Sequence, residues 1–311
     1  MVDPVGMSET LRRSNCLTAE SYWIPNHIVN SAWLTHGAFA SWLIASLEPK
    51  TVVELGTHNG FSYFAFCEAA QRLGLPTKCF ALDTWEGDDQ AGFYDEQVYR
   101  SVSEVSTANY PTSSTLLRGY FDESLAMFEN ESIDLLHIDG QHTYEDVKHD
   151  FLSWRPKLSN RAVVLFHDVA ERENDFGVWR LWEELAPGQA SFSFEHGHGL
   201  GVLGFGEEFP VGLKNLFEAD ETLSEQIRDA YRSLGGRIYG IYALLADQDQ
   251  LTKGLSAAEG SVESLQHDLA VTRGELDDIA TSQAWRIATK LRSVGSHLPG
   301  RVRRAFGRMI H

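Results

Sequence analysis

The stretch from Thr51 to Ser62, TVVELGTHNGFS, decides the fold. It opens with a five-residue apolar run, continues through a turn that contains Gly56 and Gly60, and passes into a helical pattern that extends to Ala70. A buried run, a glycine turn and a helix in this order predict a strand-turn-helix unit of a parallel sheet. In such sheets the loop after the strand lines the ligand crevice.

Apolar runs and helical patterns alternate along the following residues. Four further runs predict parallel strands, and they cover residues 78–83, 114–118, 133–138 and 161–166. Two later runs, 191–195 and 200–205, lie close together across Gly197 and Gly199 and predict an antiparallel hairpin at one sheet edge. The expected fold class is therefore α/β, a Rossmann-like, doubly wound and mostly parallel seven-stranded sheet with a C-terminal antiparallel hairpin.

The sequence changes to a helical pattern beyond Phe209. From Leu251 to Ile279 apolar positions alternate at spacings of four and three, which predicts a coiled coil that forms a homo-oligomer; a helix folded back on the domain is the alternative. Ala258 and Thr272 weaken the seam. We divide the chain into a catalytic domain (1–212, core 30–206), a helical coiled-coil segment (213–280) and a basic amphipathic tail (281–311).

The charge of the chain is unevenly distributed. The formal net charge is -18, which disfavours nucleic acid as a partner. No acidic residue follows Asp278, whereas seven Lys and Arg residues do, so the end of the chain carries +7 and the remainder -25. A basic amphipathic end fits an anionic membrane surface, a partner protein or a solvated tail.

The cysteines and the hydropathy of the chain indicate the cellular compartment in which it is expected. Three cysteines without a C-x-x-C pair indicate neither a disulfide framework nor a zinc knuckle. The first ten residues lack the pattern of a signal peptide, and no apolar run approaches the ~20 residues of a membrane span. We expect a cytoplasmic protein, with peripheral contact at the inner face of the membrane.

The first loop and the end of the second strand form one candidate binding site. The loop has a G-x-x-x-G pattern after a Glu, not the G-x-G-x-x-G of dinucleotide sites, which favours a ligand without pyrophosphate. The carboxylate of Asp83 can accept ribose hydroxyl groups, or it can cap a turn. Trp85 can offer adenine a stacking face, or it can pack in the core.

Polar side chains follow the fourth and fifth strands. Asp139 and His142 come after the fourth, and His167 and Asp168 end the fifth. Because neighbouring parallel strands lie about 5 Å apart, these groups can converge on one divalent ion, and an oxygen-rich set suits Mg²⁺ or Mn²⁺. His142, an imidazole with a pKa near neutrality, is a candidate general base for a hydroxyl group.

The pattern E-L-G-x-x-x-G-x-S followed by an Asp at the end of the next strand resembles class I S-adenosylmethionine-dependent methyltransferases, particularly their metal-dependent O-methyltransferase branch. The resemblance implies that the glycine loop surrounds the methionine part of the cofactor, that Asp83 holds the ribose and that Gly119 lies near the adenine. The loop residues concerned are Glu54, Gly56, Gly60 and Ser62.

The second cluster is similar to the metal sites of catechol-type and macrolide-sugar O-methyltransferases. That similarity implies Asp139 and Asp168 as ligands of Mg²⁺, with His167 standing where the family more often has a carboxylate or amide, so that Mn²⁺ and iron are alternatives. His142 matches the general-base position of the sugar-modifying branch. In that reading the ion fixes two substrate hydroxyl groups.

The resemblance spans residues 30–206 and extends to methyltransferases found alongside polysaccharide glycosyltransferases. It rests further on Phe176-Gly177-Val178-Trp179, on His196-Gly197-His198-Gly199 and on the ending Ser282-Gln283-Ala284-Trp285-Arg286. It implies O-methylation of a sugar hydroxyl in a cell-surface glycan or glycolipid, with glycosyltransferases as partners. Two alternatives are a non-haem iron hydroxylase and a non-catalytic scaffold that recruits glycosyltransferases.

Overall fold

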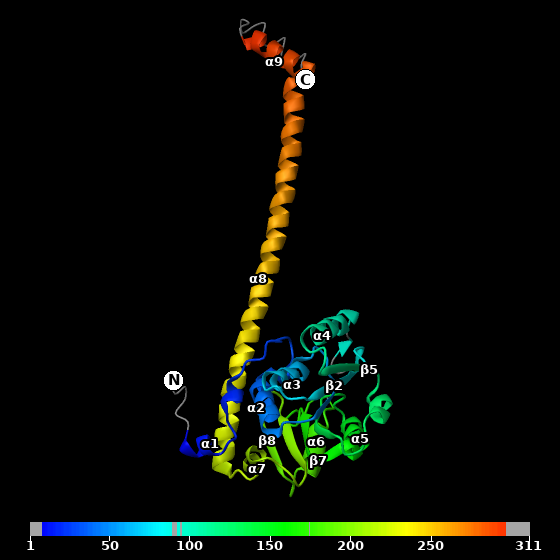
Figure 1. The fold of residues 1–311 in the computed structure, drawn as a ribbon. Coiled ribbons are helices and arrows are strands. Elements are labelled where there is room, and N and C mark those ends of the chain that lie inside the picture. Colours follow the sequence, from blue (N-terminus) through cyan, green and yellow to red (C-terminus); the bar gives the residue numbers. More distant parts are fainter. Residues whose placement is uncertain (1–7, 89–91, 94, 174, 297–311) are drawn as a thin grey trace. The chain divides into compact units, whose positions relative to one another are not determined.

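The structure is a computed structural model that describes residues 8–88, 92–93, 95–173 and 175–296 (Figure 1). It divides into two compact units, Met1–Leu244 and Leu245–His311. Within the described residues, no helix has the length and apolar character needed to cross a membrane.

The first unit is built on a seven-stranded sheet with the order β5-β2-β1-β6-β7-β9-β8. The strands are β1 Thr51–Leu55, β2 Lys78–Asp83, β5 Ser114–Arg118, β6 Ile133–Ile138, β7 Leu158–His167, β8 Ser191–Phe194 and β9 Leu200–Gly206. The first five of these run parallel, whereas β9 is antiparallel to β7 and β8. The predicted doubly wound sheet with its edge hairpin is confirmed.

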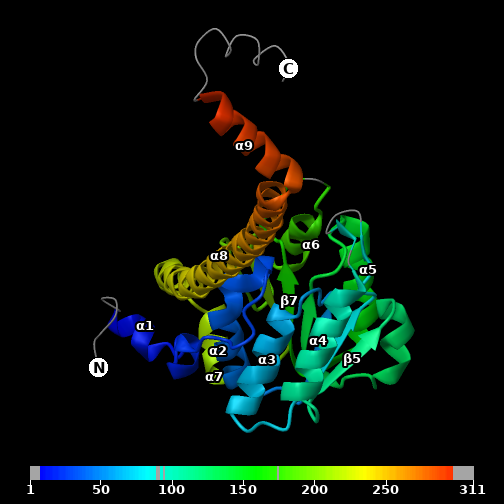
Figure 2. The ribbon, with the colours of Figure 1, turned by 90° about the horizontal axis from the view of Figure 1, so that it is seen from above.

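Helices cover both faces of this sheet, which explains why its strands read as continuous apolar runs. One face packs against α2 Gly37–Leu47, α3 Phe61–Arg72 and α7 Val211–Phe217, and the other against α5 Tyr144–Trp154 and α6 Val178–Leu185 (Figures 1 and 2). Along β1, Val52 belongs to the first layer, and Val53 and Leu55 belong to the second. Alternate side chains of each strand thus fill two separate cores.

Several elements before and between the strands were not predicted. They are α1 Glu9–Arg13, η1 Ala19–Tyr22, η2 Ala32–His36, η3 Phe121–Met127, η4 Arg155–Lys157, α4 Glu96–Asn109 and the short ribbon of β3 Gly87–Asp88 with β4 Gly92–Phe93. The segment around η2 matters for the site, because it buries Trp33 against His137 of β6 and His36 beneath the turn between β8 and β9.

The long helix α8, Glu221–Thr281, begins in the first unit and ends in the second. Its first part buries Ile227, Tyr231 and Ile238 in the core shared with α2. The Tyr231 hydroxyl donates to the Cys16 carbonyl at 2.8 Å and lies 3.0 Å from the Ser21 hydroxyl. Contacts of the first unit therefore extend beyond residue 212, and the functional boundaries at 212 and 280 stay predictions.

The second unit is helical over its described residues. It comprises the rest of α8 and α9 Gln283–Ser296. The predicted seam residues are exposed in the single chain, among them Leu251 at 75% and Leu265 at 67%. The rest of the basic tail lies outside the described residues, including the Pro299-Gly300 break and Arg301, Arg303, Arg304 and Arg308.

Candidate active site

A cavity of about 870 Å³ lies at the carboxyl ends of the central strands. Ligand sites typically measure about 300–1,000 Å³, so this cavity has room for a cofactor together with part of an acceptor. The predicted residues that line it are Gly56, Ser62, Asp83, Asp139, His142, His167 and Asp168. The glycine loop and both polar clusters therefore share one site.

The loop after β1 lies against the loop after β6. The Gly56 N–H donates to the Leu82 carbonyl at 2.9 Å, and the Asp139 N–H donates to the Leu55 carbonyl at 2.8 Å. Gly56 has a φ of +88°, and a Cβ there would lie 2.1 Å from the Asp139 carbonyl oxygen. Only glycine fits this close approach, which brings Asp139 next to the glycine loop.

Asp83 orders the first loop through backbone hydrogen bonds. The N–H groups of Thr57 and His58 donate to Oδ2, each at 2.8 Å, and the N–H of Trp85 donates to Oδ1 at 2.7 Å. A carboxylate offers about four lone-pair positions, so one position remains on Oδ1. Asp83 combines the turn-capping role with room for one further hydroxyl donor in the cavity.

Four predicted cofactor residues do not line the cavity: Glu54, Gly60, Trp85 and Gly119. Trp85 is buried, its indole N–H donates to the His58 carbonyl at 3.0 Å, and its ring packs 5.0 Å from that of Tyr99. Its ring therefore packs in the core and does not face the cavity.

Glu54 lies beneath the loop, in contact with β6. It is fully buried, and its Oε2 lies 2.7 Å from Nδ1 of His137. Burial raises the pKa of Glu54, and the pairing with His137 opposes that shift. Glu54 thus supports the loop from below, because the pair links the ends of β1 and β6.

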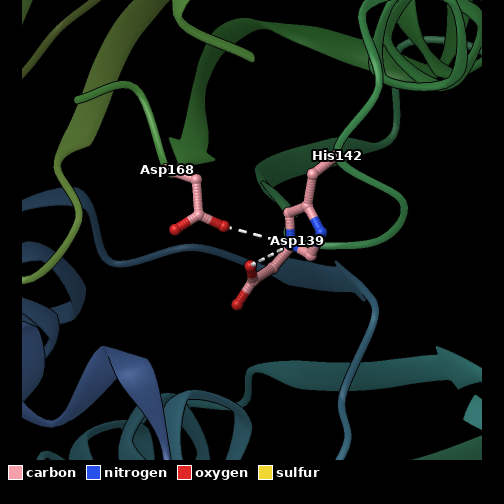
Figure 3. Close-up of side chains that lie close together, drawn as sticks. All are labelled: Asp139, His142 and Asp168. Carbon is pink, nitrogen blue, oxygen red and sulfur yellow. Dashed lines mark ion pairs between the residues drawn. The ribbon is translucent and has the colours of Figure 1, made fainter. Parts of the chain in front are cut away.

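The imidazole of His142 lies between two carboxylates (Figure 3). Its Nε2 is 3.0 Å from Oδ2 of Asp168 and 3.9 Å from Oδ1 of Asp139. One ligand atom from each of the three residues lies within 4.8 Å of the others. Burial lowers the pKa of His142, but the hydrogen bonds and charges of the two carboxylates outweigh it and raise the pKa to about 9.

His167 lies below these carboxylates and holds them in place. Its Nδ1 is 3.1 Å from Oδ1 of Asp139 and 3.3 Å from Oδ1 of Asp168, and its Nε2 is 3.1 Å from the Gly197 carbonyl. Burial opposes protonation, but both carboxylates raise the pKa of His167 well above its ordinary value. Both ring nitrogens therefore donate, and His167 acts as a buried cation in this arrangement.

A ring from the β7–α6 loop fixes the other face of His142. Phe176 stacks on the imidazole with centroids 4.6 Å apart and an interplanar angle of 13°. The N–H of Gly177 donates to the His142 carbonyl at 2.7 Å. These contacts restrict both the ring and the backbone of His142, so the imidazole is held toward Asp168.

The turn between β8 and β9 reaches the same cavity. Asp168 and His198 both have left-handed backbone conformations, with φ of 63° and 64°. The Asp168 N–H donates to the Gly199 carbonyl at 3.0 Å, and the Ala170 N–H donates to the His198 carbonyl at 2.9 Å. Such conformations cost about 1–3 kcal/mol each and concentrate at functional sites.

Glu171, Phe176 and His198 line the cavity but were not singled out from the sequence as site residues. The glycines around His198 predict the turn of the hairpin and do not by themselves indicate a site. The signal that could have found these residues is the pairing of β9 with β7, which brings the start of β9 next to Asp168. That pairing is part of the tertiary structure, and it cannot be predicted from the spacing of the hairpin residues in the sequence.

Residues 53–169 match the family model of a methyltransferase domain. The match begins in β1 and ends just after Asp168, so it contains the glycine loop, Asp83 and the cluster around His142. This part of the chain is therefore similar to a methyltransferase domain, and it lies within the mostly parallel sheet.

The chain is similar to an uncharacterized protein, y4gI, of Sinorhizobium fredii. The two are 43% identical over 265 residues, which cover 84% of this chain and 28% of that protein. This chain therefore spans little more than a quarter of that relative.

Solved structures with a similar fold include two O-methyltransferases. TomG from Streptomyces achromogenes, which is involved in tomaymycin synthesis and was solved with S-adenosylmethionine, is 17% identical over 65% of this chain and 92% of its own, with a TM-score of 0.43. The O-methyltransferase from Bacillus cereus, solved with S-adenosylhomocysteine, is 17% identical over 65% and 93%, with a TM-score of 0.44. Similarity at this level carries no information about the acceptor.

Proposed function

We propose that this chain is an S-adenosylmethionine-dependent O-methyltransferase that methylates a sugar hydroxyl group of a cell-surface glycan or glycolipid. The observation that carries the proposal is the position of His142 between Asp139 and Asp168, in the cavity that also contains Gly56 and Asp83. A base, an acidic pair and a cofactor loop within one methyltransferase domain are the groups that hydroxyl methylation requires.

The charge of the cavity favours the cofactor. Its described lining contains nine carboxylates and five histidines but no Lys or Arg. The carboxylates are Asp83, Glu86, Asp122, Asp139, Asp146, Asp150, Asp168, Glu171 and Glu173. A sulfonium cation is stabilised in such a field. In the proposed complex, the loop from Gly56 to Ser62 contacts the methionine part and the free position on Asp83 receives a ribose hydroxyl group.

His142 supplies the proton chemistry in this proposal. The acceptor oxygen attacks the methyl carbon of the sulfonium in line with the carbon–sulfur bond, and the electron pair of that bond remains on sulfur. The hydroxyl proton passes to the neutral form of the His142 imidazole, so the ring must first release the proton that Asp139 and Asp168 favour. Asp139 and Asp168 stabilise the resulting imidazolium, because both carboxylates already face that ring.

The same donor set fits a divalent cation. Asp139, Asp168 and His142 present two carboxylate oxygens and one imidazole nitrogen within 4.8 Å of one another, which suits Mg²⁺ or Mn²⁺ and admits iron. We propose Asp139 and Asp168 as the ligands; His167 could join them only after losing the proton on Nδ1. A bound ion would orient an acceptor hydroxyl group and lower its pKa.

The geometry favours methyl transfer over the two alternatives. A facial triad of an iron hydroxylase uses two imidazoles and one carboxylate, whereas the donor set here offers one imidazole and two carboxylates. The second imidazole, His167, donates from both ring nitrogens and so presents no lone pair to an ion. A non-catalytic scaffold does not require the assembly of His142, Asp168 and Phe176 in one cavity.

We also propose homo-oligomerisation through residues 251–279. The seam residues are exposed in the single chain, and a coiled coil would remove them from water. Asp268 and Arg273 flank the seam and are five residues apart. At this spacing, Asp268 of one helix and Arg273 of a parallel partner helix attract each other.

The tail is proposed to contact an anionic membrane surface on the cytoplasmic side. In α9 the exposed Trp285, Ile287 and Leu291 accompany Arg286 and Lys290, which is the composition of an interfacial helix. This position would bring the enzyme to glycolipid acceptors and to glycosyltransferases.

The test is methyl transfer from labelled S-adenosylmethionine to a panel of methyl glycosides, with Mg²⁺ present or chelated. We expect a product that depends on His142, and a His142→Gln variant that binds cofactor but transfers no label. Cofactor binding without transfer to any hydroxyl acceptor, or full activity of His142→Gln, would contradict the proposal.

A further inference from the structure

The cavity continues beyond the His142 cluster, on the side away from Asp83. Asp83 ends β2, whereas His198 precedes β9, and β1, β6 and β7 lie between these strands. Four strand spacings correspond to about 19 Å. A cofactor whose ribose lies at Asp83 therefore leaves the region around His198 for another molecule.

A hydrogen-bonded pair, His198 and Glu171, occupies this far side of the cavity. Nδ1 of His198 lies 3.1 Å from Oε2 of Glu171, and both residues line the cavity. Oε1 of Glu171 accepts the backbone N–H groups of Arg172 at 3.2 Å and Glu173 at 3.4 Å. The carboxylate is thus oriented from both oxygens, yet the pair stays accessible, with side-chain exposures of 52% for His198 and 28% for Glu171.

The turn that contains His198 is hydrogen-bonded to the residues that follow β7. His198 has a φ of 64° between two glycines of positive φ, Gly197 and Gly199. The hydrogen bonds of this turn to Asp168 and Ala170 tie its position to the cluster around His142. Glu171 follows Ala170 directly, so the pair has a fixed place relative to the proposed base.

The free groups of the pair suit hydroxyl ligands. When Nδ1–H of His198 donates to Glu171, the neutral ring presents Nε2 as an acceptor, and no described residue pairs with it. The remaining lone pairs of the Glu171 carboxylate accept hydroxyl protons as well. Acceptors on two neighbouring side chains can receive protons from two hydroxyl groups of one sugar ring.

The charges around the pair disfavour anionic groups. The described cavity lining has no Lys or Arg, and Glu173 and Asp168 add negative charge beside the pair. Phosphate and carboxylate ligands are usually held by Lys, Arg or free helix N-termini. A phosphorylated sugar would therefore meet repulsion here.

We infer that Glu171 and His198 form the acceptor-recognition element of the site and that they hold a neutral, non-phosphorylated sugar unit by its hydroxyl groups. The inference rests on the proposed function and adds the residues that select the acceptor. It makes these two residues determinants of acceptor affinity and leaves cofactor binding to the loop at Gly56 and Asp83.

The test is ligand-observed saturation-transfer NMR on the full chain with S-adenosylhomocysteine present. The probes are methyl glycosides of neutral hexoses and 6-deoxyhexoses, with glucose 6-phosphate as the anionic comparison. We expect a neutral glycoside to bind, and Glu171→Gln or His198→Asn to weaken that binding about tenfold or more. Asn at position 198 tolerates the left-handed backbone, so the turn is retained.

Glu183→Gln is the matched control, because Glu183 pairs with Arg172 outside the cavity. Calorimetric titration with S-adenosylmethionine accompanies each variant, and unchanged cofactor affinity shows that the domain remains folded. The inference is overturned if both variants bind the cofactor and also bind the neutral glycoside as tightly as the wild type. It is also overturned if the wild type prefers glucose 6-phosphate, or if it binds none of the neutral glycosides. Loss of cofactor binding by the wild-type chain overturns the proposed function instead.

Discussion

Nε2 of His142 lies 3.0 Å from Oδ2 of Asp168, although the two residues come from loops that follow different strands. Asp168 is ionised in this pair: burial raises its pKa, but the charge of His167 and the hydrogen bonds of His142 and His167 outweigh burial and lower the pKa to about 2. The contact therefore joins a permanent carboxylate to the proposed base.

Removal of that base should abolish most of the activity. Replacement of His142 by Gln keeps a polar side chain of similar size but provides no proton acceptor, so we expect kcat to fall by about 10²–10⁴. The affinity for S-adenosylmethionine should change little, because the predicted cofactor contacts lie on other loops. Steady-state kinetics and calorimetry measure the two quantities, and an unchanged kcat would exclude His142 as the base.

Phe176 should act by positioning His142. Stacked rings contribute about 0.5–1.5 kcal/mol, so Phe176→Ala should lower kcat by up to about tenfold through misplacement of the imidazole. Phe176→Tyr retains the stack and should behave like the wild type. Equal losses in the two variants, or a loss in cofactor affinity alone, would contradict a positioning role.

Ionisation of the buried Asp150 should lower the free energy of unfolding as pH rises. Burial raises the pKa of this carboxyl group to about 7, with Asp122 and Asp146 adding to the shift and His149 opposing it. Because the folded state holds the proton more tightly than the unfolded state, stability is lost as pH rises from about 4 to about 7. Asp150→Asn should recover on the order of 1–4 kcal/mol at pH 8 and almost nothing at pH 4.

Urea unfolding of the wild type and Asp150→Asn at the two pH values measures this difference. Asp249→Asn serves as the control, because Asp249 is exposed on α8. Parallel stability profiles for wild type and Asp150→Asn would show that Asp150 ionises normally in the folded protein.

Charges in the exposed seam of α8 should dissociate the proposed oligomer. The double change Leu265→Asp and Leu269→Asp places carboxylates at two seam positions, whereas Ser264→Asp with Ala270→Asp adds the same charge outside the seam. Light scattering should give a multiple of the chain mass for the wild type and the control and a single chain mass for the seam variant. A monomeric wild type at micromolar concentration would contradict the coiled coil.

The sheet could be predicted from sequence because both of its faces are covered. Continuous burial makes runs such as residues 162–166 of β7 apolar throughout, and each run ends at a loop with polar residues. The N-terminal elements could not be predicted in the same way. In α2, for example, nearly every residue is buried, so the segment shows no amphipathic period.

The candidate site was predictable where strand ends determine it. Asp139, His142 and Asp168 follow β6 and β7, which are neighbours in the sheet, and this adjacency brings them together. Glu54 and Trp85 point into the core and support the loop there. The sequence does not specify whether a residue near a loop faces the core or the cavity, so these roles could not be predicted. His198 reaches the cavity only through the pairing of β9 with β7.

Calorimetric titration of the full chain with S-adenosylmethionine tests the central claim most directly. We predict one saturable site per chain, with affinity at least about tenfold weaker in Asp83→Asn, because the amide cannot replace the carboxylate toward the loop and the ribose. Asp229→Asn, on the exposed side of α8, should bind like the wild type. A folded wild-type chain that takes up no S-adenosylmethionine would contradict the account.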